Sequence, residues 1–181
     1  NGIKITYVEN KDYATTNSGG SFYVARDEVK DGCWHFNADN VMYPEIVKNL
    51  IEDSHGDAFM CDDISPIVPE DGKCTVDERG VITEHSKEPK PKSKAEWDCL
   101  TIGCGKLSAE GVKKTVEIME SDLDYWLAKS IPWAMCDPRI DVYMVSSKAL
   151  PFTEVDEEVD LKKAREDIYP KIKEYFEKNK N

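Results

Sequence analysis

An alternation of strands and helices over the first third of the chain constrains its fold most strongly. The strand candidates are apolar runs, and the helix candidates carry apolar side chains at helical spacing. In chain order, the candidates are the strand Ile3–Val8, the helix Ser21–Val29, the buried strand Cys33–Phe36, the helix Tyr43–Asp53 and the strand Ala58–Asp62. Strands that are apolar throughout are typical of parallel sheets covered by helices. The pattern therefore predicts an α/β fold with a mixed, mostly parallel sheet flanked by helices.

The rest of the chain continues this series after a hairpin. Two strand candidates, Cys74–Asp77 and Gly80–His85, flank the turn, and the two prolines within Lys87–Lys94 predict a loop. The later candidates are the strand Trp97–Gly105, the helices Ser108–Glu120 (with Ser108 as N-cap) and Asp122–Ile131, the strands Ile140–Ser146 and Phe152–Val155, and a closing helix that Pro170 should break or kink near Tyr169. No internal repeat or long linker divides the series, so we expect a single domain over residues 1–181.

The charge of the chain limits its partners. The 181 residues include 36 Asp and Glu against 24 Lys and Arg, which gives a formal net charge of −12. A nucleic-acid backbone or an anionic membrane needs a basic face, so we expect neither as the main partner. No apolar run approaches the roughly 20 residues of a transmembrane helix, and the N-terminal sequence lacks the pattern of a signal peptide.

The cysteines and histidines do not have the spacing of a zinc site. The six cysteines include no C-x-x-C pair, and the three histidines are not arranged like metal ligands. Several of the cysteines lie within apolar runs, where thiols are usually inert residues of the core. We therefore expect reduced thiols and a cytoplasmic location, in preference to disulfides or bound zinc.

Two aspartates lie where sheets of this class bind ligands, beyond the carboxyl ends of strands. Asp39 follows Cys33–Phe36 through two residues, and Asp156 follows Phe152–Val155 and precedes the last helix. Two carboxylates that meet across the edge of a sheet suit Mg²⁺, which takes one or two protein carboxylates together with phosphate oxygens and water. Alternatively, Asp39 merely ends a strand and Asp156 caps a helix.

Two further segments carry groups that suit an anion. Tyr13–Ser21 is a polar loop with two glycines that leads into a helix, whose first N–H groups and positive end attract anions. It lacks the Gly-Lys-Ser/Thr sequence of a P-loop, and an ordinary flexible helix cap explains it equally well. Lys87 begins the only stretch dense in lysine, which either attracts an anionic substrate or belongs to a solvated loop.

The order of motifs along the chain resembles that of the nucleotidyltransferase superfamily, and most of all its small cytidylyltransferases acting on phosphocholine or aminoethylphosphonate. Val8–Ala25 resembles the family's Asn-x-x-Tyr…Thr-Asn…Ser segment, and Phe36–Met42 resembles its strand ending in a metal-binding aspartate. Thr75–Ile82, continuing to Ser86-Lys87, is similar to its hairpin ending in a phosphate-contacting lysine.

Two later motifs extend the resemblance over nearly the whole chain. Thr101–Gly103 resembles the strand that follows the hairpin, and Phe152–Ala164 resembles the closing segment that holds a second metal-binding aspartate. The resemblance implies a Rossmann-like fold of the nucleotide-diphospho-sugar transferase type. It also implies a Mg²⁺-dependent reaction that joins CTP, or another nucleoside triphosphate, to a phosphate or phosphonate monoester such as phosphocholine or aminoethylphosphonate and releases pyrophosphate.

The resemblance further assigns roles to individual residues. Asp39 and Asp156 match the ligands of Mg²⁺, and Lys87 matches the lysine that contacts the phosphoryl groups. These three residues are the expected catalytic residues. The residues that match positions for nucleotide or substrate binding are Tyr13, Asn17, Ser18, Ser21 and Ala38.

The chain departs from the family at its start. The family opens with a strand, a Leu-Ala-Ala-Gly-x-Gly-x-Arg loop and a lysine that hold the triphosphate, and this sequence contains none of them. Asn1 stands where the family's third strand would begin. We therefore expect a domain that lacks its first two βα units, is inactive alone and associates with a second copy through the gap. The alternatives are a sugar-phosphate nucleotidyltransferase and a non-catalytic subunit that only binds a partner.

Four aromatic residues lie in the part of the chain that would build the acceptor pocket of such an enzyme: Trp97, Trp126, Trp133 and Tyr143. Aromatic faces hold quaternary ammonium groups by cation–π attraction. A cage for a choline-like head group is one interpretation, and packing in the hydrophobic core is the other.

Overall fold

A six-stranded sheet forms the centre of the structure, a computed structural model that describes residues 2–67 and 72–179, with only the backbone of Pro132 and Trp133. Its strands are β1 (Gly32–Phe36), β3 (Ala58–Asp62), β4 (Lys73–Val76), β5 (Ile82–Ser86), β6 (Cys99–Ser108) and β7 (Tyr143–Ser146). The order across the sheet is β5-β4-β6-β3-β7, and β1 also pairs with β6. A separate antiparallel pair joins β2 (Asn40–Met42) to β8 (Phe152–Glu154).

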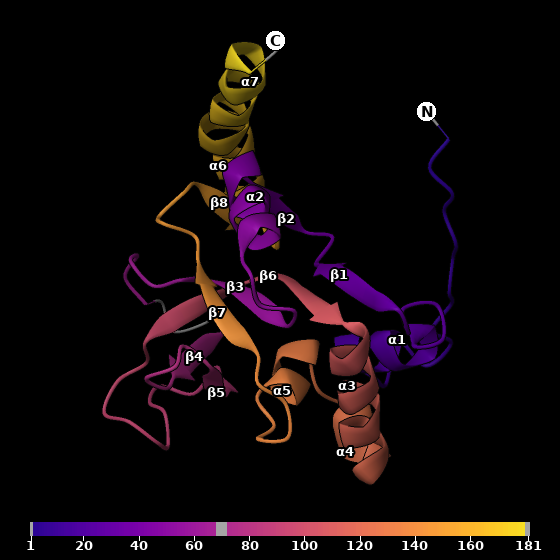
Figure 1. Cartoon of the computed structure of the whole chain (residues 1–181). Coiled ribbons are helices and arrows are strands. Elements are labelled where there is room, and N and C mark those ends of the chain that lie inside the picture. The colour runs from indigo at the N-terminus through magenta and orange to yellow at the C-terminus, as the bar shows by residue number, and fades with distance from the viewer. Residues whose placement is uncertain (1, 68–71, 180–181) are drawn as a thin grey trace.

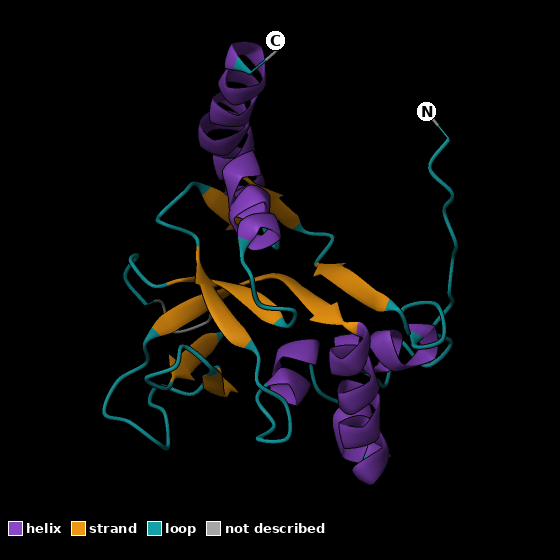
Figure 2. Ribbon diagram, in the orientation of Figure 1, coloured by secondary structure: helices purple, strands orange, loops and turns teal. Residues whose placement is uncertain are grey.

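Helices cover both faces of this sheet (Figures 1 and 2). They are α1 (Ser18–Ala25), α2 (Pro44–Glu52), α3 (Ala109–Ser121), α4 (Leu123–Leu127), α5 (Ile131–Met135), α6 (Glu158–Lys163) and α7 (Tyr169–Lys178). In the view of Figure 1, α2, α6 and α7 lie above the sheet, while α1, α3, α4 and α5 lie below it. The predicted α/β class with flanking helices is therefore confirmed.

The sheet is mixed, and β6 determines how its strands pair. In this sheet, β1, β3 and β4 are each antiparallel to β6, while β7 is parallel to β3. It follows that β1, β3, β4 and β7 share one direction, whereas β6 and β5 run the other way. Most strands therefore point the same way, as predicted. Parallel neighbours are nevertheless rare among the described strands, because β1, β3 and β4 all pair antiparallel with β6 and the parallel pair is that of β3 with β7.

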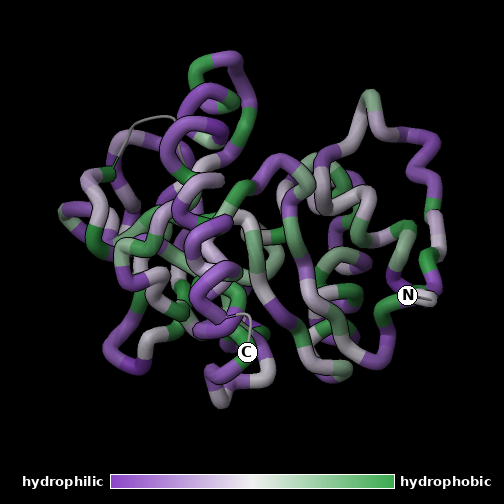
Figure 3. The backbone as a smooth tube through the Cα atoms, turned by 90° about the horizontal axis from the view of Figure 1, so that it is seen from above, coloured by the Kyte–Doolittle hydropathy of each residue, from purple (hydrophilic) through white to green (hydrophobic). Residues whose placement is uncertain are grey.

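The strand β3 carries the apolar run of residues 58–61 because it is buried on both faces. Along β3, Ala58 and Met60 pack with Ile46 and Leu50 of α2 in one core cluster. Phe59 alternates with them and packs in the second cluster, on the side of α3 and α5. Figure 3 shows apolar residues, in green, along the central strands and hydrophilic residues, in purple, along much of the surrounding helices and loops.

Several sequence predictions match these elements closely. The structure has the strand Ala58–Asp62 and the helix that begins at Pro44. Ser108 caps α3, since its side chain accepts a hydrogen bond from the Gly111 N–H at 3.0 Å. The hairpin of β4 and β5 likewise forms where it was expected, with antiparallel pairing.

Two predicted strands need correction. Ile3–Val8 is not a strand, and its apolar side chains are exposed, because no described strand lies beside this segment to pair with its backbone. The strand containing Cys33–Phe36 forms, but it is not buried. Trp34 and Phe36, which share one face of β1, are 47% and 45% exposed, whereas Cys33 on the other face packs against the core.

The predicted helix Asp122–Ile131 is shorter in the structure: α4 ends at Leu127, and a separate helix, α5, begins only at Ile131. The chain leaves α4 after Leu127, and the carbonyl groups of Leu127 and Lys129 accept hydrogen bonds from the N–H groups of Asn17 and Gly19 at 2.8 and 2.9 Å. These carbonyl groups accept hydrogen bonds from the start of α1, and not from the N–H groups that a continuation of α4 would supply. The start of α1 and the link between α4 and α5 therefore form one packed unit.

Pro170 affects the closing helix more gently than predicted. The helix continues through it by means of a π-helical turn, Ala164–Ile168, between α6 and α7. Proline cannot donate a helical hydrogen bond, and a π-turn is one way in which a helix accommodates such a disruption. The predicted break near Tyr169 is therefore a local change of helical winding.

Two observations bear on the environment of the chain. All six cysteines are free thiols in the structure. Among the helices that the structure describes, none has the length and apolar character needed to cross a lipid bilayer.

We predict that Gly19→Ala destabilises the fold, because a Cβ at this position would lie 2.5 Å from the Lys129 carbonyl oxygen and 2.6 Å from that of Trp126. Backbone atoms cannot move aside cheaply, so the expected loss is about 1–3 kcal/mol in urea unfolding. Gly56→Ala is the matched control, since its Cβ would come no closer than 3.3 Å to another atom, the Cβ of Ser108. Equal losses for the two variants would contradict this account.

Candidate active site

The pairing of β2 with β8 brings Asp39 and Asp156 together. Asn40 lies opposite Glu154 in this ladder, and beyond that pair the Val155 N–H donates to the Asp39 carbonyl oxygen at 2.9 Å. Asp39 precedes β2 and Asp156 follows β8, so both aspartates lie at the same end of the two strands. The expectation that two chain-distant carboxylates meet at one edge agrees with this arrangement.

A cavity of about 840 Å³ opens beside these two carboxylates. Of the residues that the sequence singled out, Asn17, Ser18, Ala38, Asp39, Lys87 and Asp156 line it. The remaining lining residues are Asn37, Gly72, His85, Ser86, Glu88, Thr101, Gly103, Lys129, Ser130 and Glu154. Residues from well-separated parts of the sequence thus converge on one space.

Two residues expected near the nucleotide lie apart from this cavity. Tyr13 is 78% exposed and does not line it. Ser21 is exposed and its hydroxyl accepts a hydrogen bond from the Asn10 amide at 3.1 Å. The first turn of α1 is also less open to an anion than we expected, because the N–H groups of Asn17 and Gly19 are bound to the link after α4.

The aspartate side of the cavity depends on a glycine in β6. Gly103 has φ of +68°, and a Cβ there would lie 2.6 Å from the Asn37 side-chain nitrogen and 2.8 Å from that of Asn40. The Asn37 N–H also donates to the Gly103 carbonyl oxygen at 2.9 Å. Glycine is therefore required where the turn carrying Asp39 crosses β6.

The opposite wall is formed by the end of the β4–β5 hairpin. Lys87 is exposed and directly follows β5, at the start of the loop. Beneath it, the Thr101 N–H and hydroxyl both donate to the Gly72 carbonyl oxygen, at 2.8 and 3.2 Å. These bonds attach the start of the hairpin to β6, so that β6 contributes to both walls of the cavity.

His85 is the one buried titratable residue of this wall with a clearly shifted pKa. Burial, followed by the positive charges of Lys87 and Lys73, lowers the pKa of His85 from 6.5 to about 4. The imidazole is therefore neutral near pH 7 and does not add a third positive charge between the two lysines.

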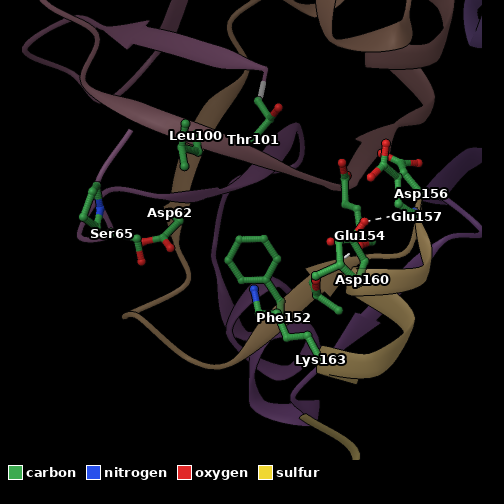
Figure 4. A pocket seen from close by; sticks show the side chains of 13 residues that line it. Asp62, Ser65, Leu100, Thr101, Phe152, Glu154, Asp156, Glu157, Asp160 and Lys163 are labelled. Carbon is green, nitrogen blue, oxygen red and sulfur yellow. Dashed lines mark hydrogen bonds between the residues drawn. The ribbon is translucent and has the colours of Figure 1, made fainter. Parts of the chain in front are cut away.

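A second cavity, of about 610 Å³, adjoins the first and shares Thr101, Glu154 and Asp156 with it. Figure 4 shows Asp62 and Ser65 on one side of this cavity, with Phe152, Glu154 and Asp160 on the other. Its other lining residues are Pro66, Leu100, Thr153, Glu157, Val159 and Lys163. The two cavities thus meet at Asp156.

Of the two interpretations of the aromatic residues, the described side chains favour packing over a cage. Trp97 is buried and its indole N–H donates to the Glu88 carbonyl oxygen at 3.0 Å, while Trp126 packs against the core and Tyr143 stacks on His55. None of these three lines either cavity. The side chain of Trp133 lies outside the described residues.

The donor set at Asp39 and Asp156 fits Mg²⁺. Both side chains offer carboxylate oxygens, the ligands that Mg²⁺ prefers, and two carboxylates leave positions for phosphate oxygens and water. No cluster of three or more metal-ligating His, Cys, Asp or Glu side chains occurs in the described part of the chain. The arrangement therefore suits an ion shared between the protein and a phosphorylated ligand, rather than one enclosed by protein alone.

Several residues of the site were missed by sequence reasoning. Lys129 and Glu154 line the cavity, and Lys73 lies behind Lys87 with its ammonium group 2.9 Å from the Lys87 carbonyl oxygen. Lys129 lies in a short link between helices, and Lys73 is an isolated lysine at the start of a strand. Neither position carries a local sequence signal for a site.

Comparisons with solved structures identify the fold. The inositol-1-phosphate CTP transferase from T. maritima matches with a TM-score of 0.67 and 21% identity over 92% of this chain and 66% of its own. The CTP:phosphocholine cytidylyltransferase from Streptococcus pneumoniae matches with a TM-score of 0.57 and 15% identity, over 87% of this chain and 66% of its own. No protein-family model and no curated protein sequence matches the chain.

A third solved structure has a similar fold. A protein from Bacillus anthracis, described as a glucose-1-phosphate thymidylyltransferase, matches with a TM-score of 0.58 and 16% identity, over 87% of this chain and 61% of its own. The neighbours are nucleotidyltransferases, so the chain has a nucleotidyltransferase-like fold, as the sequence motifs implied. It spans about two thirds of the length of the proteins it matches.

We predict that acid destabilises the fold partly through His85. Its pKa is about 4 when folded against 6.5 ordinarily, so between these values the unfolded chain binds a proton that the folded chain does not. Stability from this residue is therefore present above pH 6.5 and falls by about 3 kcal/mol as the pH drops toward 4. Urea unfolding of His85→Gln should lack this component, and a His85 ring that titrates near pH 6.5 by NMR would contradict the prediction.

Proposed function

We propose that this chain forms part of a nucleotidyltransferase that joins a nucleoside triphosphate, CTP in the first place, to a phosphate or phosphonate monoester and releases pyrophosphate. The observation that carries the proposal is the convergence of Asp39, Asp156 and Lys87 on one cavity. The nucleotidyltransferase-like fold supports it. In this reaction, an oxygen of the monoester attacks the α-phosphorus of the triphosphate in line with the departing pyrophosphate.

The proposed site works by position and charge. Asp39 and Asp156 would hold Mg²⁺, which when bound offsets the negative charge of the two phosphorylated substrates. Lys87, on the opposite wall, would stabilise negative charge on the phosphoryl groups. Asn17 and Ser18 line the same cavity from the start of α1, and their polar side chains suit contacts to the nucleotide. Tyr13 and Ser21 are not part of this proposed site.

The second cavity supports a choice of acceptor. Five of its lining residues are acidic, Asp62, Glu154, Asp156, Glu157 and Asp160, whereas Lys163 is its one basic residue. Asp62 is only 2% exposed, and its Oδ1 accepts hydrogen bonds from two backbone N–H groups. A cavity with an excess of carboxylates attracts cations. We therefore propose an acceptor with a cationic ammonium group, such as phosphocholine or aminoethylphosphonate, whose phosphorus group lies near Asp156.

We predict that Asp39→Asn and Asp156→Asn each weaken Mg²⁺-dependent binding of CTP by at least about 100-fold in calorimetry, because one lost carboxylate removes much of the hold on the metal. The double variant should bind no worse than either single variant, as expected for one shared site. Asp141→Asn is the matched control, since Asp141 pairs with Arg79 at the hairpin turn and lines neither cavity.

The same measurement separates the proposal from a non-catalytic binding role. Wild-type binding of CTP that needs no Mg²⁺, or an absence of any binding heat, would contradict a nucleotidyltransferase site. Pyrophosphate release by the intact product of the gene, with CTP and an acceptor present, is the corresponding test of activity.

We predict that amino-alcohol phosphates or aminoethylphosphonate react faster than inositol 1-phosphate or sugar 1-phosphates. Asp62→Asn should raise KM for the cationic acceptor about 10-fold, which corresponds to about 1.4 kcal/mol, and leave KM for CTP unchanged. A substrate screen in which only neutral polyol or sugar phosphates react would exclude the cationic acceptor while leaving nucleotidyl transfer intact.

A further inference from the structure

Lys73 is a lysine buried almost completely beside the proposed site. Its side chain is 1% exposed, and its ammonium group donates to the carbonyl oxygen of Lys87 at 2.9 Å. Burying an ammonium group is costly unless hydrogen bonds and charges compensate for it. A hydrophobic side chain would pack at this strand position without that cost. The position of the Lys73 ammonium therefore indicates a role beyond core packing.

That role concerns how the backbone at Lys87 is held. Lys87 follows the last residue of β5, so no ladder of the hairpin continues to fix it. Three side chains bind this short stretch instead: Lys73 binds the Lys87 carbonyl, Ser86 Oγ accepts from the Glu88 N–H at 3.1 Å, and the Trp97 indole donates to the Glu88 carbonyl at 3.0 Å. Together they fix the backbone from which the Lys87 side chain extends.

The charge of Lys73 also acts on a residue that lines the cavity. With Lys87, it contributes to the low pKa of His85, which lines the cavity beside Gly72. The electrostatic effect of the buried ammonium thus extends to a residue that lines the cavity, although Lys73 does not line it. Lys87 itself lines the same cavity as Asp39 and Asp156.

A second buried lysine provides a contrast. Lys106 is 9% exposed, donates to the Asp53 carbonyl oxygen at 2.7 Å and lies 3.8 Å from an Asp53 carboxylate oxygen. It does not line the 840 Å³ cavity or bind a residue that does. Lys106 therefore represents an ordinary structural lysine against which Lys73 is compared.

We propose that Lys73 is a positioning residue, whose bond to the Lys87 carbonyl directs the Lys87 side chain toward the phosphoryl groups of the bound substrates. This inference rests on the proposed function for the role of Lys87. It assigns to Lys73 an effect on turnover through another residue, without contact to the substrates.

The test compares Lys73→Met, Lys87→Ala and the double variant in pyrophosphate release by the intact gene product. We expect Lys73→Met to lower kcat by about 10- to 100-fold, because small misplacements of a catalytic group have effects of this size, with KM for CTP changed less than about threefold. The double variant should be no slower than Lys87→Ala, because Lys73 acts through Lys87. Losses that multiply in the double variant would overturn the proposal.

Amide hydrogen exchange supplies a readout that does not depend on activity. Exchange at Glu88 should be at least about tenfold faster in Lys73→Met and within about twofold of wild type in Lys106→Met. Unchanged exchange in Lys73→Met overturns the inference even if the enzyme is active. Wild-type protein without Mg²⁺-dependent CTP binding overturns the proposed function instead, while exchange still shows whether Lys73 fixes Lys87.

Two additional variants separate positioning from packing and from loss of folding. Lys73→Arg can still donate to the Lys87 carbonyl and should recover most of the lost kcat, which a mere packing role would not predict. If Lys73→Met does not fold, Trp97→Phe removes one donor from the same backbone stretch and keeps an aromatic ring. It should accelerate exchange at Glu88 and lower kcat in the same direction, and normal values of both would contradict the proposal.

Discussion

The pairing of β6 with three other strands is the interaction on which the rest of the structure depends. β3 pairs with one edge of β6. The other edge pairs with β4 near Cys99 and with β1 from Cys104 onward. Among the described residues, the stretch 101–103 between these two strands lacks a continuous ladder on this edge: Thr101 donates two hydrogen bonds to Gly72, and Gly103 accepts one from Asn37. The larger cavity opens at this interruption. Its position thus follows from a long strand whose one edge is divided between two partners.

The two walls at this interruption carry opposite charges for different structural reasons. The β2–β8 pair delivers Asp39 and Asp156 because both flank the same end of one short ladder. In the β4–β5 hairpin, Lys87 lies at the end of β5, and the buried Lys73 binds its carbonyl oxygen. Between them His85 stays neutral, because burial and the neighbouring cations lower its pKa. A phosphorylated ligand with a divalent cation needs such a division, with carboxylates for the metal and lysines for the phosphates.

What could be predicted from the sequence was what a local pattern encodes. The strand Ala58–Asp62 and the helix from Pro44 follow from apolar periodicity, and Asp39 and Asp156 were marked by their place after strands. The predicted strand Ile3–Val8 was wrong, because strand propensity alone cannot supply the neighbouring strand with which its backbone must pair. The role of Lys73 could not be predicted from the sequence, because it depends on a contact across the hairpin. The break before Lys129 likewise depends on Gly19, more than a hundred residues away.

The net charge of −12 argues against large polyanions as partners but says little about a nucleotide. A nucleic acid or membrane meets an extended surface, where an excess of acidic groups repels it. A triphosphate inside a cavity meets only the groups within a few ångströms, because exposed charges beyond about 8 Å are largely screened at physiological ionic strength. Lys87 and the carboxylates that would hold a cation lie within that cavity. The composition therefore limits the size of an anionic ligand, whereas the arrangement around β6 determines whether a small one is bound.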